Sequence, residues 1–402
     1  MYNDATAITA NNVTGTGFAG IYSYSSGTDI SIATTGVVYG GNYGIYARNL
    51  GTGDTTINAT NATGDASVTG GSTGIYVYQD FGSDDVTVTA NNVTGTNSDG
   101  IRIRHYGDGD ATVTATNAAG TANVNGYDYG IYTYSRYGDL AITANNVTGT
   151  NRDGIYARND FNAGSIDITA TGTITGANSG IDAYSNSGDD ITITVTNAAG
   201  DASATGESDG IRAYNSALTG AVSVTANNAT SLLFDDGVYI RTQGSGDATV
   251  NVTNAAGTGT AQGYGDGVYV GNYTGGNVGV TVDNATGQSR DGIRVYNATN
   301  TGSAAVTAYG QVYGYDNGIE VDNYGTGGIS INVTNADGTA QVTAIDNTGI
   351  DARNYNGGAV DIAVDNITAD DYGISVYNDS ASTSVSVTVN GNITVTDDTG
   401  ID

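Results

Sequence analysis

A glycine followed by isoleucine or valine recurs along the whole chain at intervals of roughly 24 to 31 residues. The glycines of this pattern are Gly20, Gly44, Gly74, Gly100, Gly130, Gly154, Gly180, Gly210, Gly237, Gly267, Gly292, Gly318, Gly349, Gly373 and Gly400. Self-similarity at such a period is typical of solenoids, in which each repeat contacts only its neighbours. The 402 residues therefore predict one stacked core rather than several separate globular domains.

Each repeat contains three short segments with the alternation of a β-strand. The first is exemplified by GIYARN (154–159), the second by VTVTA (86–90) and the third by NNVTGT (91–96). This period of two, together with the scarcity of Leu, Lys and Glu, excludes a helical repeat. The regular placement of Ile and Val argues against disorder, although the charge is high.

Alternation also assigns the faces of each strand, because successive side chains point to opposite sides. In the GIYARN segment, Ile155 and Ala157 point one way, whereas Tyr156 and Arg158 point the other. One apolar strand face cannot be buried by a single coil, so the coils must stack. We therefore expect an all-β, three-sided parallel β-helix of about 15 coils, with Ile and Val lining a shared interior.

The coils themselves form a longer repeat. Short, plain and long coils alternate in an order that suggests duplication of a five-coil block. We expect a single β-helix over residues 1–402, with blocks at approximately 1–130, 131–267 and 268–402. The additional residues of the long coils, such as TNAAGDA (196–202), should bulge from one corner.

The charge and the composition limit the partners of the chain. The formal charge of −30 argues against nucleic-acid binding and against docking on an anionic membrane, because both carry negative charge. With no Cys, thiol and disulfide chemistry are excluded. We expect no membrane insertion by this segment and no cofactor, and we expect any export signal or anchor to lie outside the chain.

The GIYARN, DxTxTA and NNVTG units resemble the repetitive passenger regions of bacterial autotransporter adhesins and related large β-helical surface proteins. The resemblance covers the whole chain and lies in the repeat text rather than in invariant catalytic residues. It implies a right-handed parallel β-helix and a location outside the cell, at the surface of a Gram-negative bacterium. It also implies a role in adhesion or aggregation.

The outward positions of the Gly-Ile strands hold mostly tyrosine and arginine. These candidate binding or assembly residues are Tyr22, Tyr24, Tyr46, Arg48, Tyr76, Tyr78, Arg102, Arg104, Tyr132, Tyr134, Tyr156, Arg158, Tyr184, Arg212, Tyr214, Tyr239, Arg241, Tyr269, Arg294, Tyr296, Arg353 and Tyr377. Strands of neighbouring coils lie about 4.8 Å apart, so these side chains should stack in register. Mutual stacking that stabilises the strand face is one interpretation. A surface for lateral contact with acidic neighbours or for glycans is the other, because protein interfaces are enriched in aromatic residues and Arg.

Three further patterns have a structural and a functional interpretation. Asn pairs such as Asn91-Asn92 should satisfy backbone groups at one corner, although they also form glycosylation sequons. Outward Thr pairs such as Thr87 and Thr89 suit strands, and a flat array of this kind also orders water in ice-binding β-helices. Aspartates also cluster in turns, at Asp84-Asp85, Asp108, Asp110 and Asp189-Asp190. These carboxylates either cap strand ends or bind calcium.

Catalysis has little support in the sequence. His105, the one histidine, has no candidate nucleophile near it along the chain. Glu320, Asp322 and Asp351 form an outward acidic cluster beside Arg353, and paired carboxylates are the catalytic groups of glycoside hydrolysis. The coils carry no long loops to build a substrate cleft, so we expect a non-enzyme, with a polysaccharide-degrading enzyme as an alternative.

The expected function is therefore an extracellular structural or adhesive rod, such as a stalk, matrix or filament element. A polysaccharide-binding adhesin is the main alternative. The expected partners are other copies of the chain, in lateral or end-to-end contact, or surface glycans. The end-to-end option rests on the terminal text, because Gly400 to Asp402 followed by Met1 to Asp4 reads GIDMYND, which matches GISVYND at 373–379. The alternative interpretation of these terminal sequences is that the chain is a segment of a longer stack of coils.

Overall fold

The alternating segments form β-strands that pair in parallel with their counterparts one coil away, as in the register Ile131↔Ile155 and Tyr132↔Tyr156. The computed structural model describes residues 6–161, 163–186, 189–298, 301–379 and 384–402. Contacts divide the chain into an N-terminal unit, Met1–Thr196, and a C-terminal unit, Asn197–Asp402. Each unit contains three parallel sheets, here called A, B and C, with one strand of each per coil.

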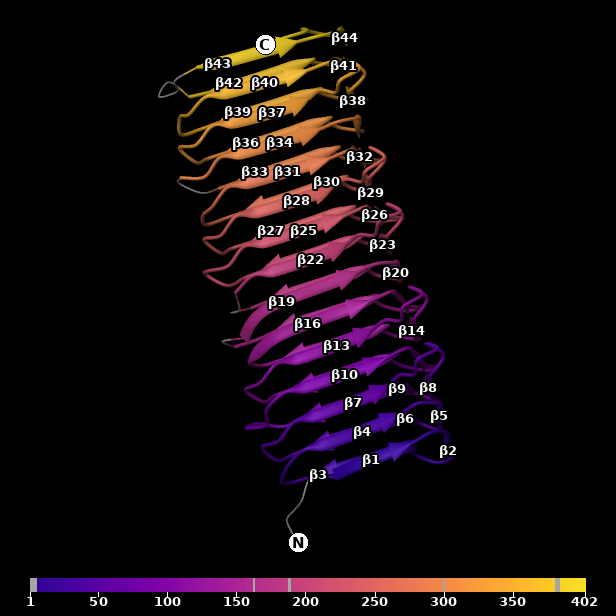
Figure 1. Cartoon of the computed structure of the whole chain (residues 1–402). Helices are drawn as coiled ribbons and strands as arrows, with labels where there is room; N and C mark the ends of the chain where they lie inside the picture. Colours follow the sequence, from indigo (N-terminus) through magenta and orange to yellow (C-terminus); the bar gives the residue numbers. More distant parts are fainter. Residues whose placement is uncertain (1–5, 162, 187–188, 299–300, 380–383) are drawn as a thin grey trace. The chain divides into compact units, whose positions relative to one another are not determined.

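The sheets of the N-terminal unit follow the chain coil by coil, from indigo to magenta in Figure 1. Sheet A consists of β1 (Thr6–Ala10), β4 (Ile30–Thr34), β7 (Thr55–Ala59), β10 (Val86–Ala90), β13 (Ala111–Ala115), β16 (Gly138–Ala144), β19 (Ala163–Ala170) and β22 (Ile191–Val195). Sheet B consists of β2 (Val13–Gly15), β5 (Val37–Gly40), β8 (Ser67–Gly70), β11 (Asn92–Gly95), β14 (Asn123–Gly126), β17 (Asn146–Gly149) and β20 (Thr173–Gly176). Sheet C, built from the Gly-Ile strands, consists of β3 (Ala19–Ser25), β6 (Tyr43–Asn49), β9 (Thr73–Gln79), β12 (Ile101–His105), β15 (Ile131–Ser135), β18 (Ile155–Asn159) and β21 (Ile181–Ser185).

The C-terminal unit repeats this order of sheets. Its sheet A consists of β25 (Val222–Ala226), β28 (Ala248–Val252), β31 (Val278–Val282), β34 (Ala304–Ala308), β37 (Ile329–Val333), β40 (Val360–Val364) and β43 (Val385–Val389). Its sheet B consists of β23 (Ser203–Gly206), β26 (Asn228–Ser231), β29 (Thr260–Gly263), β32 (Asn284–Gly287), β35 (Gln311–Gly314), β38 (Gln341–Ala344), β41 (Asn366–Ala369) and β44 (Ile393–Val395). Its sheet C consists of β24 (Ile211–Asn215), β27 (Val238–Thr242), β30 (Val268–Asn272), β33 (Ile293–Asn297), β36 (Ile319–Asn323), β39 (Ile350–Asn354) and β42 (Ile374–Asn378).

This architecture confirms the prediction of an all-β, three-sided parallel β-solenoid with about 15 coils. No helix occurs among the described residues. None of those residues therefore forms a helix long and apolar enough to cross a bilayer. The division into three five-coil blocks stays a prediction.

The interior is built as the alternation predicts. In β18, Ile155 and Ala157 are fully buried, whereas Tyr156 and Arg158 lie on the outside and are partly exposed. The same pattern recurs in β10, where Val86 is also fully buried. Parallel pairing keeps these positions in register from coil to coil within each unit, so one apolar interior runs along each unit.

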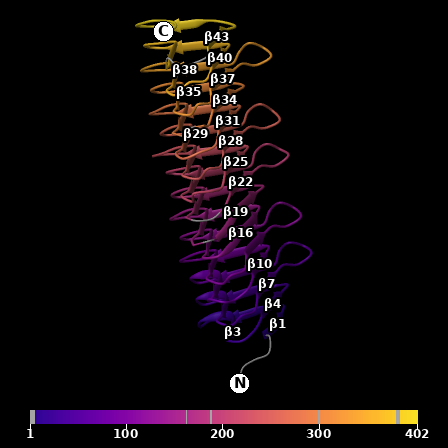
Figure 2. The ribbon, with the colours of Figure 1, turned by 90° about the vertical axis from the view of Figure 1, so that its left-hand side faces the viewer.

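The additional residues of the long coils all lie between sheets A and B, as expected. In the N-terminal unit they form loops 60–66 and 116–122, and in the C-terminal unit loops 197–202, 253–259 and 334–340. Loops that project beyond the coils are visible in Figure 2. Asn pairs of the neighbouring short coil hold three of these loops: Asn91 Oδ1 accepts a hydrogen bond from the Asn61 backbone N–H at 3.0 Å. The same geometry joins Asn117 to Asn145, which supports the structural interpretation of the Asn pairs. Asp283 and Asp365 take this place for the loops 253–259 and 334–340.

The glycine of the Gly-Ile pattern is required by close backbone approach. A Cβ on Gly154 would lie 2.7 Å from the Gly180 carbonyl oxygen and 2.8 Å from both Ile174 Cγ2 and the Thr175 oxygen. Backbone atoms of the next coil cannot move away without breaking the parallel ladder. We therefore expect Gly154→Ala to lower the free energy of unfolding by about 1–3 kcal/mol, measured by urea denaturation.

Gly17 provides the matched control for this substitution, because a Cβ added there would have no atom within 4 Å and the residue is exposed. Gly17→Ala should leave the stability unchanged or raise it by up to about 1 kcal/mol. Equal urea midpoints for the two variants would show that the corner at Gly154 tolerates a side chain.

Candidate binding face

The outward positions of sheet C form two parallel rows in each unit, here called the Tyr/Arg face. The structure places every predicted face residue on these strands. In the N-terminal unit they are Tyr22, Tyr46, Tyr76, Arg102, Tyr132 and Tyr156 in the first row, and Tyr24, Arg48, Tyr78, Arg104, Tyr134, Arg158 and Tyr184 in the second. In the C-terminal unit they are Arg212, Tyr239, Tyr269 and Arg294 in the first row, and Tyr214, Arg241, Tyr296, Arg353 and Tyr377 in the second.

Many rings of the face stack on their counterparts one coil away. The ring centroids of Tyr132 and Tyr156 are 5.3 Å apart with an interplanar angle of 14°. Tyr239 and Tyr269 are 5.1 Å apart at 11° in the C-terminal unit. Such offset stacking is favourable and accounts for part of the face as a stabilising ladder.

Most arginines of the face are held by neighbouring rings or carboxylates. The Arg102 guanidinium lies 4.9 Å from the Tyr132 ring centroid and 3.1 Å from the Asp99 carboxylate. Arg158 pairs with Asp160, also at 3.1 Å. These contacts combine cation–π attraction with charge pairing and fix the orientation of the side chains.

Arg104 differs from these arginines. Among the described residues, its guanidinium forms no ion pair, no cation–π contact and no hydrogen bond. It projects from the same strand, β12, as Arg102, and its register neighbours on the two sides are Tyr78 and Tyr134. The face therefore carries one unpaired positive charge at this point.

Aromatic residues outside the strand alternation widen the face, and the sequence-based predictions missed them. Tyr43 and Tyr129 stand immediately before the glycine of their coils, and the Tyr129 and Tyr132 centroids are 5.3 Å apart. On the other edge, Tyr106 follows the end of β12 and lies 5.4 Å from Tyr134. Their fixed offsets from the Gly-Ile pattern were a usable signal, but they lie outside the three alternating segments identified in each repeat.

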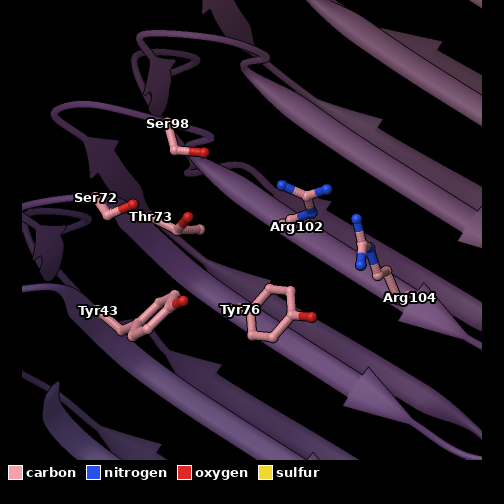
Figure 3. A pocket seen from close by; sticks show the side chains of 7 residues that line it. All are labelled: Tyr43, Ser72, Thr73, Tyr76, Ser98, Arg102 and Arg104. Carbon is pink, nitrogen blue, oxygen red and sulfur yellow. The ribbon is translucent and has the colours of Figure 1, made fainter. Parts of the chain in front are cut away.

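A hollow with a volume of about 270 Å³ lies on the N-terminal unit at the unpaired arginine. Figure 3 shows the guanidinium groups of Arg102 and Arg104 beside one another, with the ring of Tyr76 next to them. The lining residues are Tyr43, Ser72, Thr73, Tyr76, Ser98, Arg102 and Arg104. The hollow thus combines two cations, two phenol rings and three aliphatic hydroxyl groups.

Two neighbouring tyrosines of the face keep their hydroxyl protons well beyond neutral pH. Burial raises the pKa of Tyr156 to about 12. Burial, followed by the negative charge of Asp160, raises the pKa of Tyr134 to about 12 as well. These hydroxyls therefore keep their protons at neutral pH and add no negative charge to the face.

The acidic cluster of the C-terminal unit is tied to arginine. Arg353 Nη1 lies 3.0 Å from Glu320 Oε1 and 3.5 Å from Asp322 Oδ1, and Arg353 Nη2 donates to Asp351. Arg294 approaches Glu320 at 3.6 Å. A paired-carboxylate catalytic site at Glu320 and Asp351 stays a hypothesis, and in this arrangement both carboxylates are already bound to a cation.

A column of buried carboxylates lies at the corner that leads into sheet C of the C-terminal unit. Its members, here called the aspartate column, are Asp209, Asp236, Asp266 and Asp291, which immediately precede the glycine in four consecutive coils. Each is at most 5% exposed. Asp236 Oδ1 accepts the backbone N–H of Asp266 at 2.8 Å, and Asp266 Oδ1 accepts that of Asp291 at 2.9 Å. The column therefore closes the corner between coils.

Burial raises the pKa values of three of these carboxyl groups. Burial, followed by the charge of Asp266, raises the pKa of Asp236 to about 8 and that of Asp291 to about 8. Burial raises the pKa of Asp266 to about 6. These residues lie outside the alternating segments of the sequence, and no signal in the alternation distinguishes a buried corner residue from a solvated one.

A second polar row lies inside the solenoid at the end of the sheet C strands. Asn297 Nδ2 donates to Asn323 Oδ1 at 3.0 Å, and Asn323 Nδ2 donates to Asn354 Oδ1 at 3.0 Å. In the N-terminal unit, His105 occupies the same strand position and is fully buried. Its Nε2 lies 2.9 Å from the Asp84 oxygen, and burial lowers its pKa, so this histidine is a neutral interior residue.

The Asp-rich turns cap strand ends. Asp85 Oδ1 accepts the backbone N–H of Asp110 at 2.9 Å, and Asp110 Oδ1 accepts that of Asp139 at 2.8 Å. Within the described ranges, no group of three or more His, Cys, Asp or Glu side chains is placed to hold a metal ion. The capping interpretation accounts for these carboxylates, and calcium binding there stays untested.

Comparison with protein-family models, with curated proteins and with solved structures finds no match to this chain. The function must therefore be argued from the surface itself. The Tyr/Arg face is regular, partly exposed and follows the coils rather than forming a cleft, which suits an extended contact better than the enclosure of a small substrate.

Proposed function

We propose that this chain is an extracellular structural and adhesive solenoid segment whose Tyr/Arg face makes lateral or surface contact. The observation that carries the proposal is the in-register display of aromatic and arginine side chains, coil after coil, on one sheet of each unit. Aromatic residues and arginine are enriched at contact surfaces because they provide a large area at a small entropic cost.

The charge distribution supports contact with acidic partners. The formal charge is −30, and the chain contains arginine but no lysine. Face arginines such as Arg48, Arg104 and Arg241 therefore present positive charge on an otherwise acidic molecule. Another copy of the chain offers complementary carboxylates, and so do acidic glycans at a cell surface. A bacterial surface or matrix is the setting that we propose for such contacts.

Removing three neighbouring rings tests the face. Tyr132→Ser, Tyr134→Ser and Tyr156→Ser together should lower lateral association, or retention on surface polysaccharide, by at least about tenfold, because a central aromatic cluster provides much of the energy of a contact. Analytical ultracentrifugation and retention on immobilised polysaccharide measure the two effects. Far-UV circular dichroism should show that the triple variant remains folded.

The control replaces three exposed tyrosines that lie off the face. Tyr39, Tyr127 and Tyr309 are 42%, 51% and 47% exposed and lie outside sheet C. Their joint replacement by serine should leave association and retention unchanged. Association that survives the face variant, or is lost equally in the control variant, would reject the Tyr/Arg face as the contact surface.

A further inference from the structure

We propose that the hollow at Arg102 and Arg104 binds one carboxylate-bearing pyranose, a uronic acid residue of an acidic polysaccharide. This inference rests on the proposed function and names the ligand for one site on the face. The site is defined by β12, the strand IRIRH, which places two outward arginines on one coil between the tyrosines of the coils on either side.

The unpaired cation identifies the charge of the ligand. Arg102 is already bound to Asp99 at 3.1 Å, whereas no described carboxylate contacts Arg104. A guanidinium presents a planar fork of donors that matches the two oxygens of a carboxylate. The hollow therefore has a net positive charge and an arginine that is free to form a bidentate pair with a carboxylate.

The remaining lining identifies a sugar as the carrier of that carboxylate. The rings of Tyr43 and Tyr76 offer aromatic surface, whose centroids are 5.7 Å apart, for the C–H face of a pyranose. Hydroxyls of Ser72 and Ser98 lie at the opposite side of the hollow from Arg104 in Figure 3 and suit ring hydroxyls. A volume of about 270 Å³ is small for a ligand site, which fits one sugar unit rather than a longer segment.

A second copy of the chain is the competing occupant, because its surface is rich in aspartate. A short aspartate side chain would engage Arg104 alone and would leave the two rings and the hydroxyls of the hollow without a partner. The combination of cation, rings and hydroxyls therefore favours the saccharide. The two occupants predict different results in a binding experiment with a defined probe.

The probe is tetragalacturonate, and its fully methyl-esterified form is the matched neutral ligand. Isothermal titration calorimetry on the full chain should detect binding of the acid and at least about tenfold weaker binding of the ester, because the ester removes the charge-assisted pair. Arg104→Gln should weaken binding of the acid by at least about tenfold, and Arg104→Lys by less. Added NaCl should weaken it as well.

The control variant is Arg290→Gln, which removes an exposed arginine of the C-terminal unit outside the Tyr/Arg face and should not change binding. Equal affinity for acid and ester, or unchanged binding by Arg104→Gln, would overturn the proposal. If wild-type chain ignores tetragalacturonate but Arg104→Gln abolishes self-association, the occupant is a second copy and the saccharide is rejected. In that case the contact role of the face survives, since it is tested separately by the tyrosine variants.

Discussion

Replacing Asn323 by leucine should lower the free energy of unfolding of the C-terminal unit by about 3–5 kcal/mol. Asn323 is fully buried at the end of β36. Its Nδ2 donates to Asn354 Oδ1 at 3.0 Å and to the Gly327 oxygen at 2.8 Å, and its Oδ1 accepts from Asn297 at 3.0 Å. Leucine has a similar volume but makes none of these bonds, so several buried polar groups would lose their partners. Urea denaturation followed by circular dichroism measures the change.

An outward asparagine of the same unit is the control. Asn332 occupies an outward position of β37, between two buried residues. It accepts one hydrogen bond from Thr334 at 2.8 Å. Asn332→Leu should change the free energy of unfolding by less than about 1 kcal/mol, because water replaces that bond. Similar losses in the two variants would mean that the interior asparagine row does not stabilise the coils more than a surface residue does.

The solenoid and its faces were predictable because two periods coincide in the sequence. The coil period places Ile131 next to Ile155, and the strand period turns Tyr156 outward, so these two features decide the interior and the rows of the face. Parallel stacking allows few other arrangements once an apolar side chain recurs at every coil.

The polar interior was not predictable by the same reasoning. Alternation continues from Ile155 and Ala157 to Asn159, which is fully buried. A polar residue after two apolar ones is typical of the end of a strand, and its burial depends on how tightly the following turn closes. The burial of Asp236 could not be predicted for the same reason, because Asp236 belongs to a corner whose depth is determined only when the coils stack.

The hollow at Arg104 depends on side-chain contacts rather than on position. The alternation places Arg102 and Arg104 on the face equally, yet one binds Asp99 and the other has no carboxylate partner among the described residues. Arg102 is the paired arginine because the buried Asp99, three residues before it, lies 3.1 Å from its guanidinium. Sequence reasoning therefore located the face, and the structure was needed to distinguish a paired cation from an unpaired one.

Raising the pH from 5 to 9 should destabilise the C-terminal unit by a few kcal/mol, because one unit of pKa shift corresponds to about 1.4 kcal/mol. The pKa values of Asp236 and Asp291 are raised from 3.8 to about 8, and that of Asp266 to about 6. A group whose pKa is higher in the folded state holds its proton more tightly there. Its contribution is complete below the unfolded pKa near 3.8 and is lost as the pH rises through the folded values, so the window is about pH 4 to 8.

Asp236→Asn tests this assignment, because an amide keeps the acceptor oxygen and carries no charge. The chain already uses this solution one coil beyond Asp291, where Asn317 Oδ1 accepts the Thr348 N–H at 3.2 Å and Asn317 Nδ2 donates to Asp291 at 3.0 Å. The variant should be more stable than wild type at pH 8, nearly equal at pH 5, and its stability should depend less on pH. The acidic neighbours Asp266, Asp209 and Asp235 add to the rise in the pKa of Asp236. Arg212 and Arg290 line the same hollow, and the pKa of Asp236 is raised with both of them in place.

Asp337→Asn is the control for net charge, since Asp337 is exposed in the loop 334–340 of the same unit and its removal changes the formal charge by the same amount. It should alter the pH dependence of stability far less than Asp236→Asn does. Urea midpoints at pH 5, 6, 7, 8 and 9 compare the three proteins directly. Wild-type stability that rises between pH 5 and 8, or an Asp236→Asn variant less stable than wild type at pH 8, would mean that the aspartate column is ionised and favourable in the folded chain.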